Sequence, residues 1–170
     1  MHRDALEAMY ADESFYWGTD HNALVERAVE HAPNRSDRVA VDIGAGEGRD
    51  AVYLADRGMD VLAVDVAANG LGKAERLADE RGVTVHPVLA DVNSLELAAP
   101  VDVVYSIGTI QYLRPGNREA RFGHLKERTR PGGVHALFAF VDGDLPPAPD
   151  WGDNERLYDP GELGRYYEDW

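Results

Sequence analysis

The chain has 170 residues, of which 44% are hydrophobic and 28% are charged, and this predicts one domain, residues 1–170, with a buried core. Its net charge of −14, from 31 acidic and 17 basic residues, disfavours contact with nucleic acid phosphates. The lack of cysteine excludes disulfides, thiolate nucleophiles and cysteine-ligated zinc. Because no apolar run reaches membrane-spanning length and no signal region opens the chain, a cytoplasmic protein without a membrane partner is expected.

The basic residues are almost all arginine, since Lys73 and Lys126 are the only lysines. An acidic surface that is poor in lysine resembles that of halophile proteins, where counterions screen the repulsion between carboxylates. Ordinary acidic solubility is the alternative, although solubility alone gives no reason for the scarcity of lysine.

The first predicted helix spans residues 21–32, and Asp20 is its expected N-cap. Just before it, Tyr16 and Trp17 can pack against the helix as a hydrophobic staple. The apolar residues that recur at helical spacing are Leu24, Val25, Ala28, Val29 and Ala32.

A strand at 38–43 then runs into the most informative segment. Glycines alternate at Gly44, Gly46 and Gly48, and a helix is predicted over 47–57. A strand, a glycine loop and a helix in this order form a cradle for a nucleotide cofactor. The dinucleotide fingerprint requires its third glycine where this chain has Arg49, and this disfavours NAD.

The second strand, at 61–65, ends at Asp65, about twenty residues after the first glycine. A carboxylate at this position can accept hydrogen bonds from both ribose hydroxyls of a bound nucleotide. A helix N-cap is the alternative role. The following helix, at 69–81, is weakened by two internal glycines and is expected to stop at Gly82.

Three further strands complete the pattern. The strand at 83–89 leads to Asp91 and Val92, which suit the adenine edge of a cofactor, although Asp91 alone is typical of a turn. A strand at 101–106 and a helix at 117–129 follow. Arg130-Pro-Gly-Gly133 then predicts a tight reversal before a last strand at 134–140.

These segments resemble a known family. Asp42-x-Gly-x-Gly-x-Gly48 is similar to motif I of the class I S-adenosylmethionine (SAM) dependent methyltransferases, and Arg130-Pro-Gly-Gly133 to the element before their fifth strand. The segments 16–19, 48–55 and 158–170 look like the tellurite-resistance branch of small methyltransferase domains. Together with the alternation of helices and strands, the resemblance implies an α/β, Rossmann-like doubly wound, mainly parallel sheet of strand order 3-2-1-4-5.

The resemblance also implies SAM as cofactor and S-adenosylhomocysteine as product. Motif I, Asp42 and the exit of the fourth strand would hold the methionine end, Asp65 the ribose and Asp91 the adenine, while Trp17 would belong to a flap. The expected cofactor-binding residues are Trp17, Asp42, Gly44, Ala45, Gly46, Gly48, Arg49, Asp65, Val66, Asp91, Val92, Ser106 and Ile107.

Methyl transfer from a sulfonium needs an aligned acceptor and the exclusion of water, but no metal. The six histidines lack metal-ligand spacing, and no metal is expected. His21 is the candidate base, since histidine is the side chain suited to proton transfer near neutral pH, and a surface residue in the first turn of the helix is its alternative role. Tyr112 and Arg114 are candidates for contact with the acceptor. The expected acceptor is a small molecule such as a thiol or a selenium or tellurium oxyanion, which needs no dedicated base.

Two other functions stay open from the sequence. A non-catalytic SAM-binding module would keep every cofactor residue. A nicotinamide-dependent oxidoreductase would use the same strands, although Arg49 and the two carboxylates Asp65 and Asp91 argue against it.

The end of the chain raises a further expectation. The resemblance implies two more strands beyond Trp170, and without them strand 134–140 becomes an apolar sheet edge, which proteins usually cover. The segment 142–150 is too rich in proline to pair with it. Either the chain is shortened or a second copy covers the edge, and we expect homo-oligomerisation through this strand.

Overall fold

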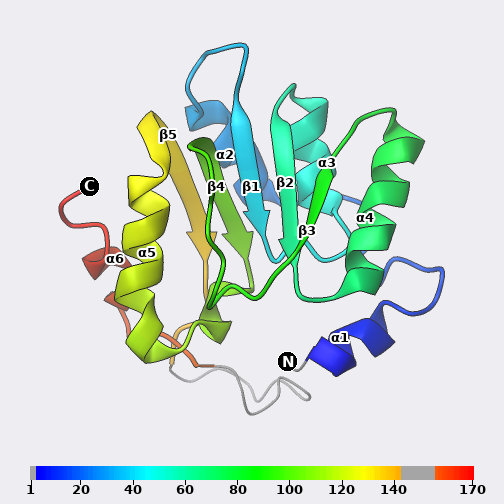
Figure 1. Cartoon of the computed structure of the whole chain (residues 1–170). Helices are drawn as coiled ribbons and strands as arrows, with labels where there is room; N and C mark the ends of the chain where they lie inside the picture. The colour runs from blue at the N-terminus through cyan, green and yellow to red at the C-terminus, as the bar shows by residue number, and fades with distance from the viewer. Residues whose placement is uncertain (1–2, 143–155) are drawn as a thin grey trace.

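The structure, a computed structural model, describes residues 3–142 and 156–170. Its centre is a five-stranded sheet with the strand order β3-β2-β1-β4-β5, in which every neighbouring pair is parallel (Figure 1). This confirms the predicted Rossmann-like, doubly wound α/β fold and its strand order. The strands are β1 (Val39–Ile43), β2 (Asp60–Asp65), β3 (His86–Leu89), β4 (Val101–Ile107) and β5 (Thr129–Phe138).

Helices and the C-terminal segment cover both faces of the sheet. Successive side chains of a strand point to opposite faces. Val61 of β2 accordingly belongs to the core cluster that includes residues of α2, α3 and α4, while Val64 belongs to the cluster that includes residues of α5 and Tyr158. The helices are α1 (Arg3–Met9), α2 (Ala23–His31), α3 (Arg49–Asp56), α4 (Ala68–Arg81), α5 (Arg118–Glu127) and α6 (Glu162–Arg165), with 3₁₀ turns η1 (Ile110–Tyr112) and η2 (Pro115–Asn117). In the described part of the chain, no helix is long and apolar enough to cross a membrane.

The N-terminal region differs from the prediction in two ways. Helix α2 begins at Ala23, and its N-cap is Asn22, whose side chain accepts a hydrogen bond from Leu24 N at 2.9 Å. The prediction of Asp20 as the cap was therefore wrong. Helix α1 was not predicted, because a tertiary contact holds it: the Glu7 carboxylate accepts hydrogen bonds from the free backbone N–H groups of Ala68 and Asn69 at the start of α4.

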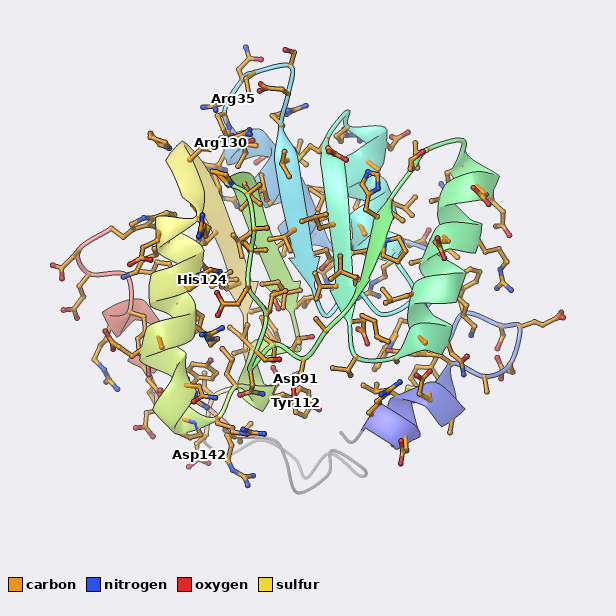
Figure 2. All side chains as sticks on the ribbon, in the orientation of Figure 1. Arg35, Asp91, Tyr112, His124, Arg130 and Asp142 are labelled. Atoms are coloured by element: carbon orange, nitrogen blue, oxygen red, sulfur yellow. The ribbon has the colours of Figure 1, made fainter. Side chains whose placement is uncertain are left out.

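The segment Arg130–Gly133 is part of β5 and not a turn before it. The pairing between β4 and β5 is irregular here: Val101 pairs with Thr129, and Val103 already pairs with Val134. Four residues of β5 therefore lie opposite one residue of β4 and form a bulge, where the buried carboxylate of Asp102 accepts a hydrogen bond from the Arg130 guanidinium at 2.8 Å. Figure 2 shows Arg130 at the opposite end of the sheet from Asp91 and Tyr112.

The last strand forms one edge of the sheet, as predicted. The C-terminal segment packs beside it: Tyr158 makes a bridge with Val141, and the ring of His135 contacts Tyr167 and Trp170. The proline-rich segment predicted not to pair with this strand lies, from residue 143 on, outside the described residues. Homo-oligomerisation through the edge stays a prediction.

Candidate cofactor and acceptor site

A cavity of about 600 Å³ opens at the carboxyl ends of the strands, where open parallel sheets bind their ligands. The loops after β1, β2, β3 and β4 form its floor and sides, and the N-terminal region closes one side (Figure 1). Of the predicted site residues, the cavity is lined by Trp17, Asp42, Gly44, Ala45, Gly46, Arg49, Asp65, Val66, Asp91, Val92, Ile107, Tyr112 and Arg114.

Two residues of the loop between β1 and α3, Gly44 and Gly48, must be glycine because of their backbone conformation and their close neighbours. Gly44 has a positive φ of 84°, and a Cβ there would lie 1.7 Å from the hydroxyl oxygen of Thr109. Gly48 has a φ of 89°, and its Cβ would lie 2.4 Å from the Cβ of Ala74. Gly48 therefore permits the close approach of α3 to α4 and does not line the cavity, in contrast to its predicted place among the cofactor residues.

Asp42 lies at the end of β1 on the cavity floor and is 2% exposed. Burial, and then the negative charges of Asp50 and Asp65, raise the pKa of this carboxyl well above its usual range. A carboxyl group that keeps its proton to higher pH can donate a hydrogen bond to a ligand as well as accept one.

Asp65 is not the N-cap of α4, which is Ala67, and its contact with a ribose stays a prediction. One carboxylate oxygen accepts from the N–H of Ala67 before α4, and the other accepts from the N–H of Gly46 in the glycine loop, each at 2.9 Å. Burial raises its pKa above the usual value. Because each carboxylate oxygen has a second lone pair, Asp65 can still accept hydrogen bonds from a ligand in the cavity.

The exits of β3 and β4 are tied together by Asn93. Its side chain donates to Asp91 Oδ1 at 2.9 Å and to the Tyr112 carbonyl at 3.0 Å, and it accepts from the N–H of Arg114 at 2.9 Å. Asp91 thus adopts the predicted turn conformation while it lines the cavity. Figure 2 shows Asp91 and Tyr112 close together at this edge of the sheet.

Two predicted residues lie away from the cavity. Ser106 is fully buried, and its hydroxyl donates to the Ile43 carbonyl at 2.7 Å, so that it links β4 to β1. His21 stacks on Tyr53 at a centroid distance of 3.9 Å and pairs with Glu26 at 2.8 Å. Neither side chain lines the cavity, so the structure does not bring Ser106 and His21 together with the other predicted site residues, and their proposed roles stay predictions.

The N-terminal region supplies cavity residues that the sequence did not indicate. Tyr10 is buried at the end of α1, and its hydroxyl accepts a hydrogen bond from the indole N–H of Trp17 at 3.0 Å. Arg3 and Leu6 of α1 also line the cavity. Trp17 borders the same cavity, and its role as a flap stays a prediction.

A second group of unpredicted residues lies on the side of β4 and β5. Phe138 and Phe140 line the cavity and contact each other edge to face at 5.2 Å. Arg156 lines it from the C-terminal segment, where its backbone N–H donates to the Gln111 carbonyl at 2.8 Å. Phe138 and Phe140 end the last predicted strand, so the rule that ligands bind at the carboxyl ends of parallel strands could have indicated them. No local signal could have placed Arg156 here. Among the described residues, no cluster of three or more histidine, aspartate and glutamate side chains could hold a metal ion.

The chain belongs to the methyltransferase domain family, whose model matches residues 40–133. It is 24% identical over 163 residues to the probable S-adenosyl-L-methionine-dependent methyltransferase TehB of Haemophilus influenzae, covering 95% of this chain and 56% of that protein. It is 30% identical over 131 residues to the malonyl-[acyl-carrier protein] O-methyltransferase of Enterobacter lignolyticus, covering 74% of this chain and 50% of that protein.

A third relative is the tRNA 5-carboxymethoxyuridine methyltransferase of Escherichia coli, 30% identical over 105 residues, or 59% of this chain and 39% of that protein. The chain thus spans about half the length of the curated relatives it matches. The crystal structure of TehB superposes with a TM-score of 0.74 at 23% identity, covering 99% of this chain and 55% of that one.

The cofactor of this family is SAM, and the cavity fits it. The glycine loop lines the cavity between β1 and α3, and the carboxyl groups of Asp42 and Asp65 border the same cavity. Both carboxyl groups retain hydrogen-bonding capacity toward a nucleoside with a charged amino acid end.

Proposed function

We propose that the chain is a SAM-dependent methyltransferase that acts on a small molecule. The observation that carries this proposal is that the glycine loop, Asp42 and Asp65 converge on one cavity. Of the whole protein's activity, the chain would supply cofactor binding and the acceptor pocket.

Each group in the cavity has a proposed role. The glycine loop, Asp42 and Ile107 hold the methionine end, Asp65 and Val66 hold the ribose, and Asp91 and Val92 hold the adenine. Bound SAM supplies a methyl group on a positively charged sulfur, and transfer removes that charge. The protein's own contribution is therefore orientation and the exclusion of water, to which the Trp17 side of the cavity contributes.

The acceptor is proposed to be anionic. Arg114 and Arg156 line the cavity beside Phe138 and Phe140, and arginines attract anions even in a chain of net charge −14. A thiolate or a selenium or tellurium oxyanion has already lost its proton and needs no base. Relatives act on tRNA and on malonyl-[acyl-carrier protein] according to their names, but the acidic surface disfavours tRNA.

A binding module without turnover is the second candidate function, because the cofactor residues alone provide binding. Calorimetry with SAM and S-adenosylhomocysteine tests cofactor binding, and a methyl-release assay over thiols, selenite and tellurite tests turnover. Tight binding without turnover on any acceptor would favour the binding module. Binding of NADH in place of SAM would overturn the proposal.

A matched set of variants tests the acceptor. Arg114→Gln and Arg156→Gln are expected to raise the KM for an anionic acceptor about tenfold each, since a charge-assisted hydrogen bond contributes about 1.5 kcal/mol. Arg81→Gln, an exposed change of the same charge at the end of α4, is the control. An unchanged KM in both cavity variants would contradict an anionic acceptor.

A further inference from the structure

The centre of the glycine loop carries a buried charge that the proposed chemistry does not use. Glu47 lies between Gly46 and Gly48 and is 2% exposed. A carboxylate removed from water in this way is costly unless it is paired and hydrogen-bonded. Its partners therefore reveal what it holds in place.

All of its partners connect the loop to the N-terminal segment or to α4. The backbone N–H groups of Tyr16 and Trp17 donate to Oε1 and Oε2 of Glu47, each at 3.0 Å. Lys73 of α4 donates to Oε1 at 2.8 Å and also to the Ser14 carbonyl. One buried ion pair thus fastens residues 14–17, which we call the strap, to the cofactor loop.

Two more bonds orient the end of the strap. The Arg49 guanidinium donates to the Trp17 carbonyl at 3.1 Å, and the Trp17 indole N–H donates to the Tyr10 hydroxyl at 3.0 Å. With its backbone and its ring both fixed, Trp17 still remains 48% exposed and lines the cavity. A large aromatic side chain held half-exposed against a binding cavity is a preorganised surface for a ligand.

We propose that Glu47, paired with Lys73, is a positioning residue that sets the affinity for SAM by holding Trp17 against the cofactor cavity. This inference rests on the proposed function. Glu47 borders the cavity, but it is 2% exposed and its carboxylate is bonded to the strap and to Lys73, so we assign its effect on the ligand to Trp17. A direct contact of Glu47 with SAM would instead make the losses in a variant that lacks both side chains multiplicative.

A double-mutant cycle in the full chain tests the inference. Glu47→Gln keeps the size of the side chain but removes its charge, and Trp17→Ala removes the aromatic surface. Each single change is expected to raise the calorimetric Kd for SAM about tenfold. The double variant is expected to bind no more weakly than the weaker single variant, because both changes remove the same surface.

The controls separate positioning from a general loss of structure. Glu80→Gln makes the same charge change on an exposed side chain of α4 that pairs with Arg76, and it is expected to leave the Kd unchanged. Hydrogen exchange at the amides of Tyr16 and Trp17 is expected to accelerate in Glu47→Gln and not in Glu80→Gln. If Glu47→Gln fails to fold, Lys73→Gln removes the ion pair from the other side, with the same expected direction.

The outcomes distinguish the two proposals. Wild-type protein that does not bind SAM would overturn the proposed function and the inference with it. Wild-type protein that binds SAM, combined with a normal Kd in Glu47→Gln or with multiplicative losses in the double variant, would overturn the inference alone.

Discussion

At the scale of single residues, the carboxylates around the cavity differ in what they already bind. Asp65 is buried and accepts one backbone N–H on each oxygen, whereas Asp91 is exposed and has Oδ1 occupied by Asn93. A buried carboxylate that bonds a ligand contributes more than an exposed one, because less water competes for its oxygens.

We therefore expect Asp65→Ala to weaken SAM binding by about 1 to 3 kcal/mol, the usual cost of lost hydrogen bonds to a charged acceptor. Asp91→Ala is expected to cost less, because in the proposed binding mode a backbone amide shares the contact with the adenine. Calorimetry measures both affinities, with Asp56→Ala, an exposed change at the end of α3, as the control. Equal losses at Asp65 and Asp91 would show that the two roles were assigned wrongly.

At the scale of elements, β5 is joined to the C-terminal segment through a neutral histidine. Thr129 donates its hydroxyl hydrogen to the Leu125 carbonyl, so it accepts from His135 Nε2 at 2.7 Å. The other ring nitrogen of His135 then accepts from the Tyr167 hydroxyl at 2.8 Å. Burial, and then the charge of Lys126, lower the pKa of His135 to about 4.

This pKa predicts a loss of stability in acid. Between the unfolded value near 6.5 and the folded value near 4, the unfolded chain binds a proton that the folded chain does not, so stability falls as the pH falls through this window. Urea unfolding of the wild type is expected to lose about 2 kcal/mol more between pH 7 and pH 5 than that of His135→Gln. Parallel curves for the two proteins would contradict a neutral, half-buried His135.

At the scale of the whole molecule, the large negative net charge is the feature that most affects the stability of the folded state. The net charge of −14 is spread over a chain with two lysines, and one of these, Lys73, is buried against Glu47. The mutual repulsion of surface carboxylates opposes the compact state and is screened by salt.

The melting temperature is therefore expected to rise steeply from low salt to molar KCl. SAM affinity is expected to change far less over the same range, because the cavity contacts are local and partly buried, where screening is weak. Calorimetric scans and titrations in one KCl series measure both quantities. A melting temperature that does not respond to salt would contradict a high-salt adaptation.

The amino-acid sequence by itself determined the α/β alternation, the strand order through the family resemblance, and the position of the cofactor cradle. These features depend on local chemistry: apolar strands, glycines at positions of positive φ such as Gly44, and a carboxylate at the end of β2. Parallel strands then bring Asp42, Asp65 and Asp91 to one edge of the sheet, and this could be foreseen without coordinates.

Only the tertiary structure decided which residues close the cavity and which of the predicted residues do not line it. The positions of Tyr10, Glu47 and Arg156 depend on contacts between segments far apart in the chain, such as the bond from the Tyr16 N–H to Glu47. The Ser106 side chain lies in the core and not in the cavity, because its hydroxyl donates a hydrogen bond to the Ile43 carbonyl. Local sequence patterns specify which helices and strands form. The partners of each polar side chain depend instead on the three-dimensional packing, because buried polar and charged groups must be hydrogen-bonded or paired.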